Sequence, residues 1–214
     1  WTLHIMHQLH TNHRLAALAD PHPGVRENAV RIVELGRVPT VTDSALMSLA
    51  NDDDVRVRFR VALALGAISE WGSVSNKHVN KALETIARRD AADEWVRTAV
   101  LSSASDRSAD LLMAIPLRNY SDDGESRLRL LRELAVIAGT REDGKELSRL
   151  SQHLLSLAAG DRAAANAIFL REILLGLGDD PGRSRLLRAG RLGQQVAREH
   201  AAVEQQRVLQ PQLH

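Results

Sequence analysis

The feature that most constrains this chain is an internal repeat in its first half. A turn containing aspartate, a Val-Arg pair and an apolar helical stretch follow one another three times. The pairs are Val25-Arg26, Val57-Arg58 and Val96-Arg97, and the preceding aspartates are Asp20, Asp52 and Asp90. The pairs lie 32 and 39 residues apart, which is within the period of two-helix repeats that stack on one another. The pattern therefore predicts an all-α array of helix pairs.

The rest of the chain continues this array with a weaker pattern. Helices are expected at 42–50 and 75–88 between the Val-Arg segments. Further pairs are expected at 106–114 with 125–138, at 143–158 with 162–177, and at 181–189 with 194–209. We divide the chain into a remnant helix of a preceding repeat (1–10), well-patterned repeats (11–104) and degenerate repeats of the same array (105–214), about five to six units in all. Because the chain begins at Trp1 inside a helical pattern, we expect a fragment of a larger protein.

Composition agrees with packed helices. Leucine and alanine supply 32 and 29 residues, whereas aromatic residues make up only 3%. Leucine and alanine are strong helix formers, while sheet proteins use aromatic and β-branched residues. No apolar run approaches the roughly 20 residues of a membrane span. The chain has no cysteine, which excludes disulfides, thiolate zinc sites, thiol nucleophiles and covalently attached haem.

Each position of the repeat has an expected role. The aspartates are expected to accept hydrogen bonds from the N–H groups that open each second helix. The valines are expected to fill the seam between two helices, and each following arginine to reach an acidic turn in its own or the next repeat. The small residues that should let helices approach closely are Ala29, Ala62 and Ala99. Trp95 is expected in the core, and Trp71 at a more exposed helix end.

The acidic turn, the Val-Arg pair and the following alanine resemble the HEAT-like repeat, including the variants of phycobilisome-lyase-type families. The resemblance is strong over 14–104 and fades beyond 105. It implies an α-solenoid of HEAT-like two-helix repeats, whose units bury their apolar faces only against neighbouring units.

Longer strings resemble one particular array. They are Leu15 to Arg31, Val57 to Gly66 and Asp93 to Ser103, together with Trp1 to His4. This array is the helical middle of large bacterial proteins classed as membrane-bound dehydrogenases, in which a β-propeller precedes the HEAT-like repeats and a haem c domain follows. The resemblance implies an exported protein, periplasmic or membrane-associated, whose redox chemistry lies outside this segment. The Cys-x-x-Cys-His motif of haem c attachment does not occur here, so no haem ligand is assigned.

Histidines cluster at the start of the chain and are the candidates for a metal site. Neighbouring histidines three residues apart on one helix can share a metal ion, and His4, His7 and His10 have this spacing, with His13 continuing it. A tight site needs a further ligand such as a carboxylate, and none is near in sequence. A His-rich surface is the simpler interpretation.

Other chemical motifs also have structural explanations. The carboxylate groups, such as Asp52-Asp53-Asp54, stand in turns beside helix starts, where capping explains them better than acid–base catalysis. The serines at 102–108 lack a Gly-x-Ser-x-Gly turn, and Gly176-Leu177-Gly178 lacks the third glycine of a phosphate loop. We therefore assign no catalytic residue and no cofactor to this segment.

The predicted function is a non-enzymatic scaffold for docking proteins or flanking domains, with binding side chains that include Arg60, Glu70, Arg88 and Arg89. The first alternative is a connector between a propeller dehydrogenase-like domain and a haem c domain. The second is a nucleic-acid binder that uses the basic residues 183–214, which carry six arginines and two acidic residues. The whole chain has a net charge of only +1, and this segment lacks aromatic residues for base stacking, so nucleic acid is the weaker alternative.

Overall fold

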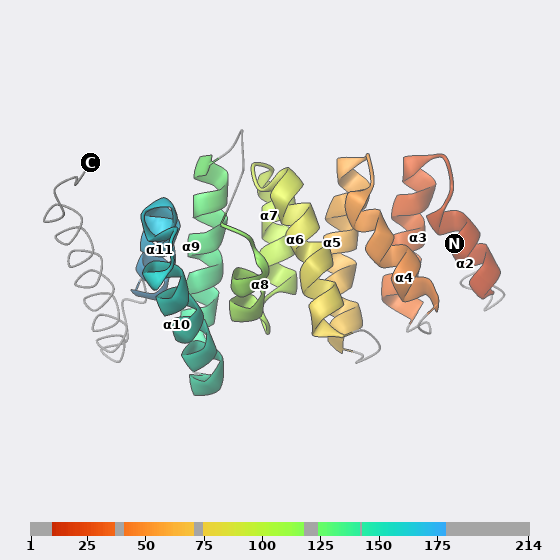
Figure 1. Ribbon diagram of the computed structural model, residues 1–214. Helices are drawn as coiled ribbons and strands as arrows, with labels where there is room; N and C mark the ends of the chain where they lie inside the picture. The colour runs from red at the N-terminus through yellow and green to blue at the C-terminus, as the bar shows by residue number, and fades with distance from the viewer. Residues whose placement is uncertain (1–9, 37–40, 71–74, 118–123, 142, 179–214) are drawn as a thin grey trace, which may run out of the picture. The chain divides into compact units, whose positions relative to one another are not determined.

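The structure is a computed structural model that describes residues 10–36, 41–70, 75–117, 124–141 and 143–178. Every regular element in these ranges is helical (Figure 1). The chain divides into two compact units, residues 1–107 and 108–214.

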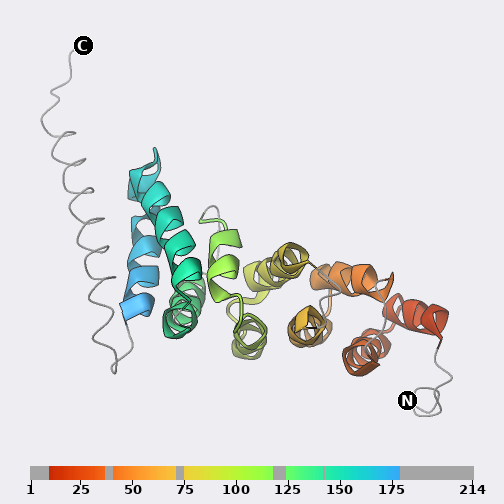
Figure 2. The ribbon, with the colours of Figure 1, turned by 90° about the horizontal axis from the view of Figure 1, so that it is seen from below.

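The first unit has two layers of helices. The first layer holds α2 (Thr11–Leu18), α4 (Val41–Ser48) with the short 3-10 helix η1 (Leu49–Asn51), and α6 (Asn76–Asp90). The second layer holds α3 (Pro23–Gly36), α5 (Val55–Glu70) and α7 (Glu94–Ser103). Figure 2 shows the two layers as separate rows. Within the second layer, α3 packs on α5 and α5 on α7, so each helix pair is stacked on the next.

The second unit repeats this arrangement. Helices α8 (Ser108–Ala114) and α9 (Gly124–Thr140) form one pair, and α10 (Gly144–Ala159) and α11 (Ala163–Gly178) form the next. Helix α9 packs along α11, while α8 contacts α10. The predicted fold class, all-α with stacked two-helix repeats, is thereby confirmed over the described residues. The helices with predicted bounds begin and end within two residues of their predicted positions; they are α4 with η1, α6, α8, α9, α10 and α11.

Small side chains allow the second-layer helices to lie close together. Ala29, Ala62 and Ala99 are all buried. At Gly66 of α5, a Cβ atom would lie 2.7 Å from the Ser103 hydroxyl and 3.0 Å from the Ser103 Cα. At Gly176 of α11, a Cβ would lie 2.3 Å from the backbone oxygen of Arg132 in α9. Close packing of adjacent repeats therefore depends on glycine at one position in each unit.

Two side chains depart from the expected core. Val57 and Val96 are fully buried as predicted, but Val25 is 40% exposed. The second helices α5 and α7 each pack on a preceding second helix, whereas α3 has no such neighbour among the described residues. Trp95 is 74% exposed, so its predicted core position is wrong. The predicted helices at 181–189 and 194–209 and Trp71 fall outside the described residues.

Candidate functional site

The repeat arginines lie at the edge where each first helix turns into its second helix. Arg26 donates Nε to Asp52 Oδ2 at 2.7 Å and Nη2 to Asp52 Oδ1 at 2.8 Å. Its third nitrogen, Nη1, donates to the backbone oxygens of Asp20 and Pro21 at 2.8 and 3.0 Å. A single guanidinium thus closes its own turn and holds the carboxylate of the next one.

Arg58 repeats this geometry in the next helix pair, where its side chain is more deeply buried. Its Nε and Nη2 each lie 2.6 Å from an oxygen of Asp90. Its Nη1 donates to the backbone oxygens of Asp52 and Asp53 at 2.6 and 3.0 Å. The Arg58 and Asp90 side chains are only 5% and 9% exposed. Two-point pairing of this kind fixes both distance and orientation, so the contact sets the register between neighbouring repeats.

The arginines of the three Val-Arg repeats share one backbone contact. Arg26, Arg58 and Arg97 each donate Nη1 to the backbone oxygen of the residue six positions earlier. For Arg97 this acceptor is Ala91, the residue after Asp90. The third turn has one more residue between its aspartate and its arginine than the first two turns. The side chain of Arg97 is buried like that of Arg58.

The contacts between repeat arginines and the aspartates of the next repeat, Arg26 with Asp52 and Arg58 with Asp90, are called the turn ladder here. These contacts shift the pKa values of the groups that form them. Burial opposes ionisation of Asp52, but hydrogen bonds from the Arg26 side chain and the Asp54 N–H outweigh it, and the pKa of Asp52 is lowered. The hydrogen bond to Asp90 raises the pKa of Arg58, as the bond to Asp52 raises that of Arg26. The Asp52 carboxylate is held ionised and already accepts hydrogen bonds from Arg26 and from the Asp54 N–H, which suits a structural role better than proton transfer.

The starts of α5 and α7 are capped by different aspartates from those predicted, and at the start of α3 the His22 ring accepts from the Gly24 N–H. Asp20 and Asp52 accept from N–H groups two residues later, at His22 and Asp54, and so stabilise the turn before the helix. The first turn of α5 is capped by Asp54, which accepts from the Arg56 N–H at 2.8 Å. Asp93 caps α7 by accepting from the Trp95 and Val96 N–H groups. The predicted capping role therefore belongs to residues two or three positions downstream of the repeat aspartates.

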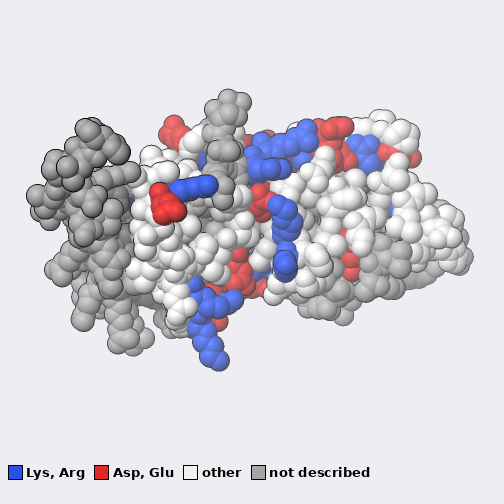
Figure 3. Space-filling model, in the orientation of Figure 1, with Lys and Arg blue, Asp and Glu red and all other residues white. Residues whose placement is uncertain are grey.

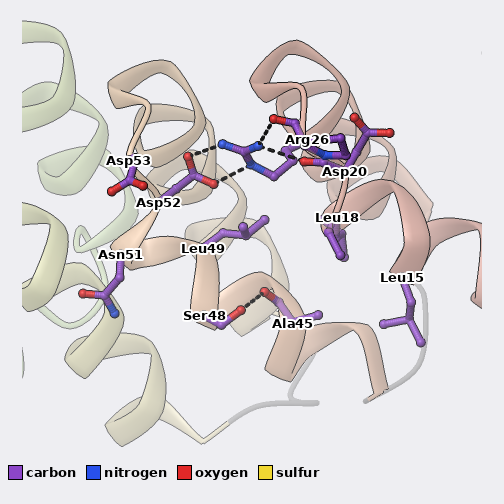
Figure 4. Close-up of a pocket in the computed structure, with 12 residues that line it drawn as sticks. Leu15, Leu18, Asp20, Arg26, Ala45, Ser48, Leu49, Asn51, Asp52 and Asp53 are labelled. Atoms are coloured by element: carbon purple, nitrogen blue, oxygen red, sulfur yellow. Dashed lines mark hydrogen bonds and ion pairs between the residues drawn. The ribbon is translucent and has the colours of Figure 1, made fainter.

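An open groove of about 500 Å³ lies beside the Arg26–Asp52 pair. Figure 4 shows Arg26 between Asp20 and Asp52 at its polar end, with Leu15, Leu18 and Leu49 along its apolar side. The Asp20 and Asp52 carboxylates facing the groove already accept hydrogen bonds within the protein. The groove is the seam between the first two helix pairs, and its chemistry is that of repeat packing.

The outward face of the second layer is a different kind of surface. Each second helix has exposed or part-exposed side chains at the same distances in sequence from its repeat arginine. Because these positions are three or four residues apart, they form a stripe along the helix. We call this set the second-layer face; it comprises Glu27, Arg31, Leu35, Arg56, Phe59, Leu63, Trp95, Thr98 and Ser102. It mixes aromatic, aliphatic and charged groups, the combination that anchors protein partners.

Trp95 is the most exposed large apolar residue of the described chain, at 74%. The Asp93 cap places it in the first turn of α7. On that helix Thr98 and Ser102 are exposed three and seven positions later, whereas Val96, Ala99, Val100 and Ser103 face the core. The two polar residues at i+3 and i+7 are the signal in the sequence that indicates an outward-facing tryptophan.

The other predicted binding residues are placed as follows. Arg88 and Arg89 are exposed on α6, whereas Arg60 is only part exposed and lies 3.7 Å from Glu34 of α3. The side chain of Glu70 is outside the described residues. The basic segment 183–214 is outside them as well.

Of the metal candidates, His4 and His7 are outside the described residues. The His10 and His13 rings are 5.7 Å apart, centroid to centroid. Across the part of the chain that the structure describes, no three His, Cys, Asp or Glu side chains are grouped as a metal ion would require. None of the described helices combines the length and the apolar character needed to span a bilayer.

Comparison with known protein families gives a match to one part of the chain. Residues 11–105 match the family model of HEAT repeats. Neither the curated proteins nor the solved structures yielded a match to the chain. The match covers the segment in which the aspartate, valine and arginine recur, and the resemblance to the middle of the large dehydrogenases stays a prediction.

Proposed function

We propose that this chain is a non-enzymatic scaffold that docks a protein or a neighbouring domain on the second-layer face of residues 11–105. HEAT repeats commonly serve as protein-interaction scaffolds, and this is the part of the chain that matches them. The proposal rests above all on Trp95, whose indole is 74% exposed on a helix that is firmly capped and packed. A large aromatic side chain on a rigid support binds a partner with little loss of conformational entropy.

The surroundings of Trp95 fit a docking role. On α5, Phe59 and Leu63 are part exposed at the positions equivalent to Thr98 and Ser102 of α7. On α3, Leu35 is 59% exposed. Apolar groups separated by charged ones, here Arg56 and Arg31, are typical of transient protein interfaces. The Asp52 and Asp90 carboxylates, by contrast, are each paired with the arginine of the preceding repeat, which favours binding over catalysis.

Site-specific photo-crosslinking tests the proposal. A benzophenone amino acid replaces Thr98 in the full-length protein in its own cells, and the same amino acid at Ser44 of the first layer serves as the control position. We expect a discrete adduct from position 98 that is lost when Trp95→Ala is added. Adducts from position 44 alone, or a position-98 adduct that Trp95→Ala leaves intact, would contradict the proposal.

A further inference from the structure

Helix α6 presents an entirely basic or neutral face to the outside. Its exposed cations are Lys77, Lys81, Arg88 and Arg89, and the residues between them on this side are His78 and Thr85. The acidic residues of the helix, Glu84 and Asp90, are both buried, at 2% and 9% exposure. We call the four cations the α6 basic face. Figure 3 shows Lys and Arg side chains following this helix on the first-layer side of the unit.

The spacing places these charges in one line. Lys77, Lys81 and Arg88 are related by four and eleven residues, which on an α-helix keeps them within about 40° of each other. The line is about 16 Å long, since each residue advances the helix by about 1.5 Å. A row of cations of this length matches the carboxylates along two or three turns of an acidic helix or a short acidic strand.

Two of the four cations have no acidic partner within the described residues. Lys81 lies 2.8 Å from Glu84, and Arg89 lies 3.9 Å from Asp53 and donates to the backbone oxygen of Asp52. No ion pair involves Lys77 or Arg88 among the groups that the structure places. Like charges in a row repel one another and favour an oppositely charged ligand, and the two unpaired cations stand at the ends of the line.

The neighbouring first-layer helices carry no such charge. The exposed residues of α4 include Ser44 and Ser48, and those of α2 include Asn12, His13 and Ala16. Among the first-layer helices of the first unit, the exposed lysines and arginines are therefore confined to α6. Nucleic-acid binding draws its affinity from many phosphate contacts, about six to ten in well-studied proteins, and this face offers at most four. The observations favour a narrow acidic polypeptide.

We propose that the α6 basic face docks an acidic peptide segment of a protein partner, with Lys77 and Arg88 as the two end contacts. The face lies on the first layer, away from Trp95, so this inference stands independently of the proposed function. An acidic segment on α6 and a second contact on the second-layer face are separate events, and each is open to its own test.

Fluorescence anisotropy of a labelled decaglutamate peptide with the full chain tests the proposal. We expect saturable binding that weakens as salt is raised, and no binding of a decaglutamine control. The double variant Lys77→Glu/Arg88→Glu is expected to lower the affinity by about tenfold or more. The matched control is Lys145→Glu, which reverses an exposed lysine at the start of α10, and it is expected to change the affinity by less than about twofold.

Three outcomes would overturn the proposal. Equal losses in the α6 variant and the Lys145 control would show that only overall charge matters. Absence of decaglutamate binding at low salt would remove the ligand class. Tighter binding of a labelled DNA duplex than of the peptide, lost in the same α6 variant, would assign the face to nucleic acid. Circular dichroism of the double variant shows whether it is folded; should it unfold, the single variant Arg88→Gln takes its place.

Discussion

Arg58 and Asp90, which are 32 residues apart, are joined by two hydrogen bonds of 2.6 Å in a setting where both side chains are almost fully buried. The guanidinium also closes the turn that begins at Asp52. One side chain therefore links three features of the fold: its own turn, its own helix and the end of the next first helix. Together with the matching Arg26–Asp52 contact, the Arg58–Asp90 contact explains why an arginine follows the valine in the first two repeats.

Removal of the Arg58 side chain is expected to destabilise the first unit strongly. Loss of one partner from a buried pair leaves the other charge without compensation, and Arg58→Ala is expected to cost about 3 kcal/mol. The measurement is the free energy of urea unfolding, followed by circular dichroism. Arg56→Ala is the control, because Arg56 pairs with Asp54 at a side chain that is 64% exposed. A similar loss in both variants would show that Arg58 has no special role.

The stability of the chain is expected to fall in acid. Asp52 has a lowered pKa, and that of Asp54 is lowered to about 2 by hydrogen bonds from the Arg56 side chain and backbone. The folded state therefore binds fewer protons than the unfolded state, in which these groups have a pKa of about 3.9. Their stabilisation is complete above that value and is lost as the pH falls toward about 2.

The corresponding measurement is the urea midpoint between neutral pH and about pH 2. Asp52→Asn is expected to be less stable than the wild type at pH 7 and to show a shallower decline in acid. A variant whose midpoint runs parallel to that of the wild type over the whole range would show that Asp52 ionises alike in both states.

Glycine at position 66 is expected to be required for the contact between α5 and α7. In Gly66→Ala the new methyl group meets Ser103, whose hydroxyl donates a buried hydrogen bond of 2.7 Å to the Ala62 backbone oxygen. Overpacking at such a site costs about 1–3 kcal/mol, which thermal unfolding detects as a lower Tm. Gly144→Ala, where nothing lies within 4 Å of the added atom, is the control. An unchanged Tm in Gly66→Ala would mean that the two helices lie farther apart.

Trp95 is expected to contribute to binding and little to stability. Because its side chain is mostly in water, Trp95→Phe is expected to change the unfolding free energy by less than about 0.5 kcal/mol. Acrylamide quenching of tryptophan emission is expected to change in this variant, since the exposed indole of Trp95 is removed. A large loss of stability, with quenching unchanged, would place Trp95 in the core after all.

The sequence predicts the fold well because the repeat is periodic. The helices at 42–50, 75–88 and 125–138 correspond to α4 with η1, α6 and α9, and their ends follow from acidic turns and glycines. The Val-Arg spacing also predicts that arginine reaches an acidic turn, although the spacing alone does not show whether that turn is its own or the next one. The structure has Arg26 and Arg58 contacting both.

Surface assignments were harder to predict, and for physical reasons. Burial of a side chain depends on what lies across from it, so the equivalent valines at 25 and 57 differ in exposure although their local sequences agree. Trp95 was misplaced because large aromatic residues are usually buried, while its polar neighbours at i+3 and i+7 indicated the reverse. The α6 basic face depends on the burial of Glu84, which pairs with Lys81. Composition cannot reveal this contact.

A double-mutant cycle on Arg58 and Asp90 tests most directly whether the repeats are stacked through this ladder. The unfolding free energies of the wild type, Arg58→Ala, Asp90→Ala and the double variant are compared by urea titration. Stacked repeats predict a coupling of about 1 kcal/mol or more, with the double variant losing far less than the sum of the single losses. Single losses that add to within about 0.3 kcal/mol would contradict the account.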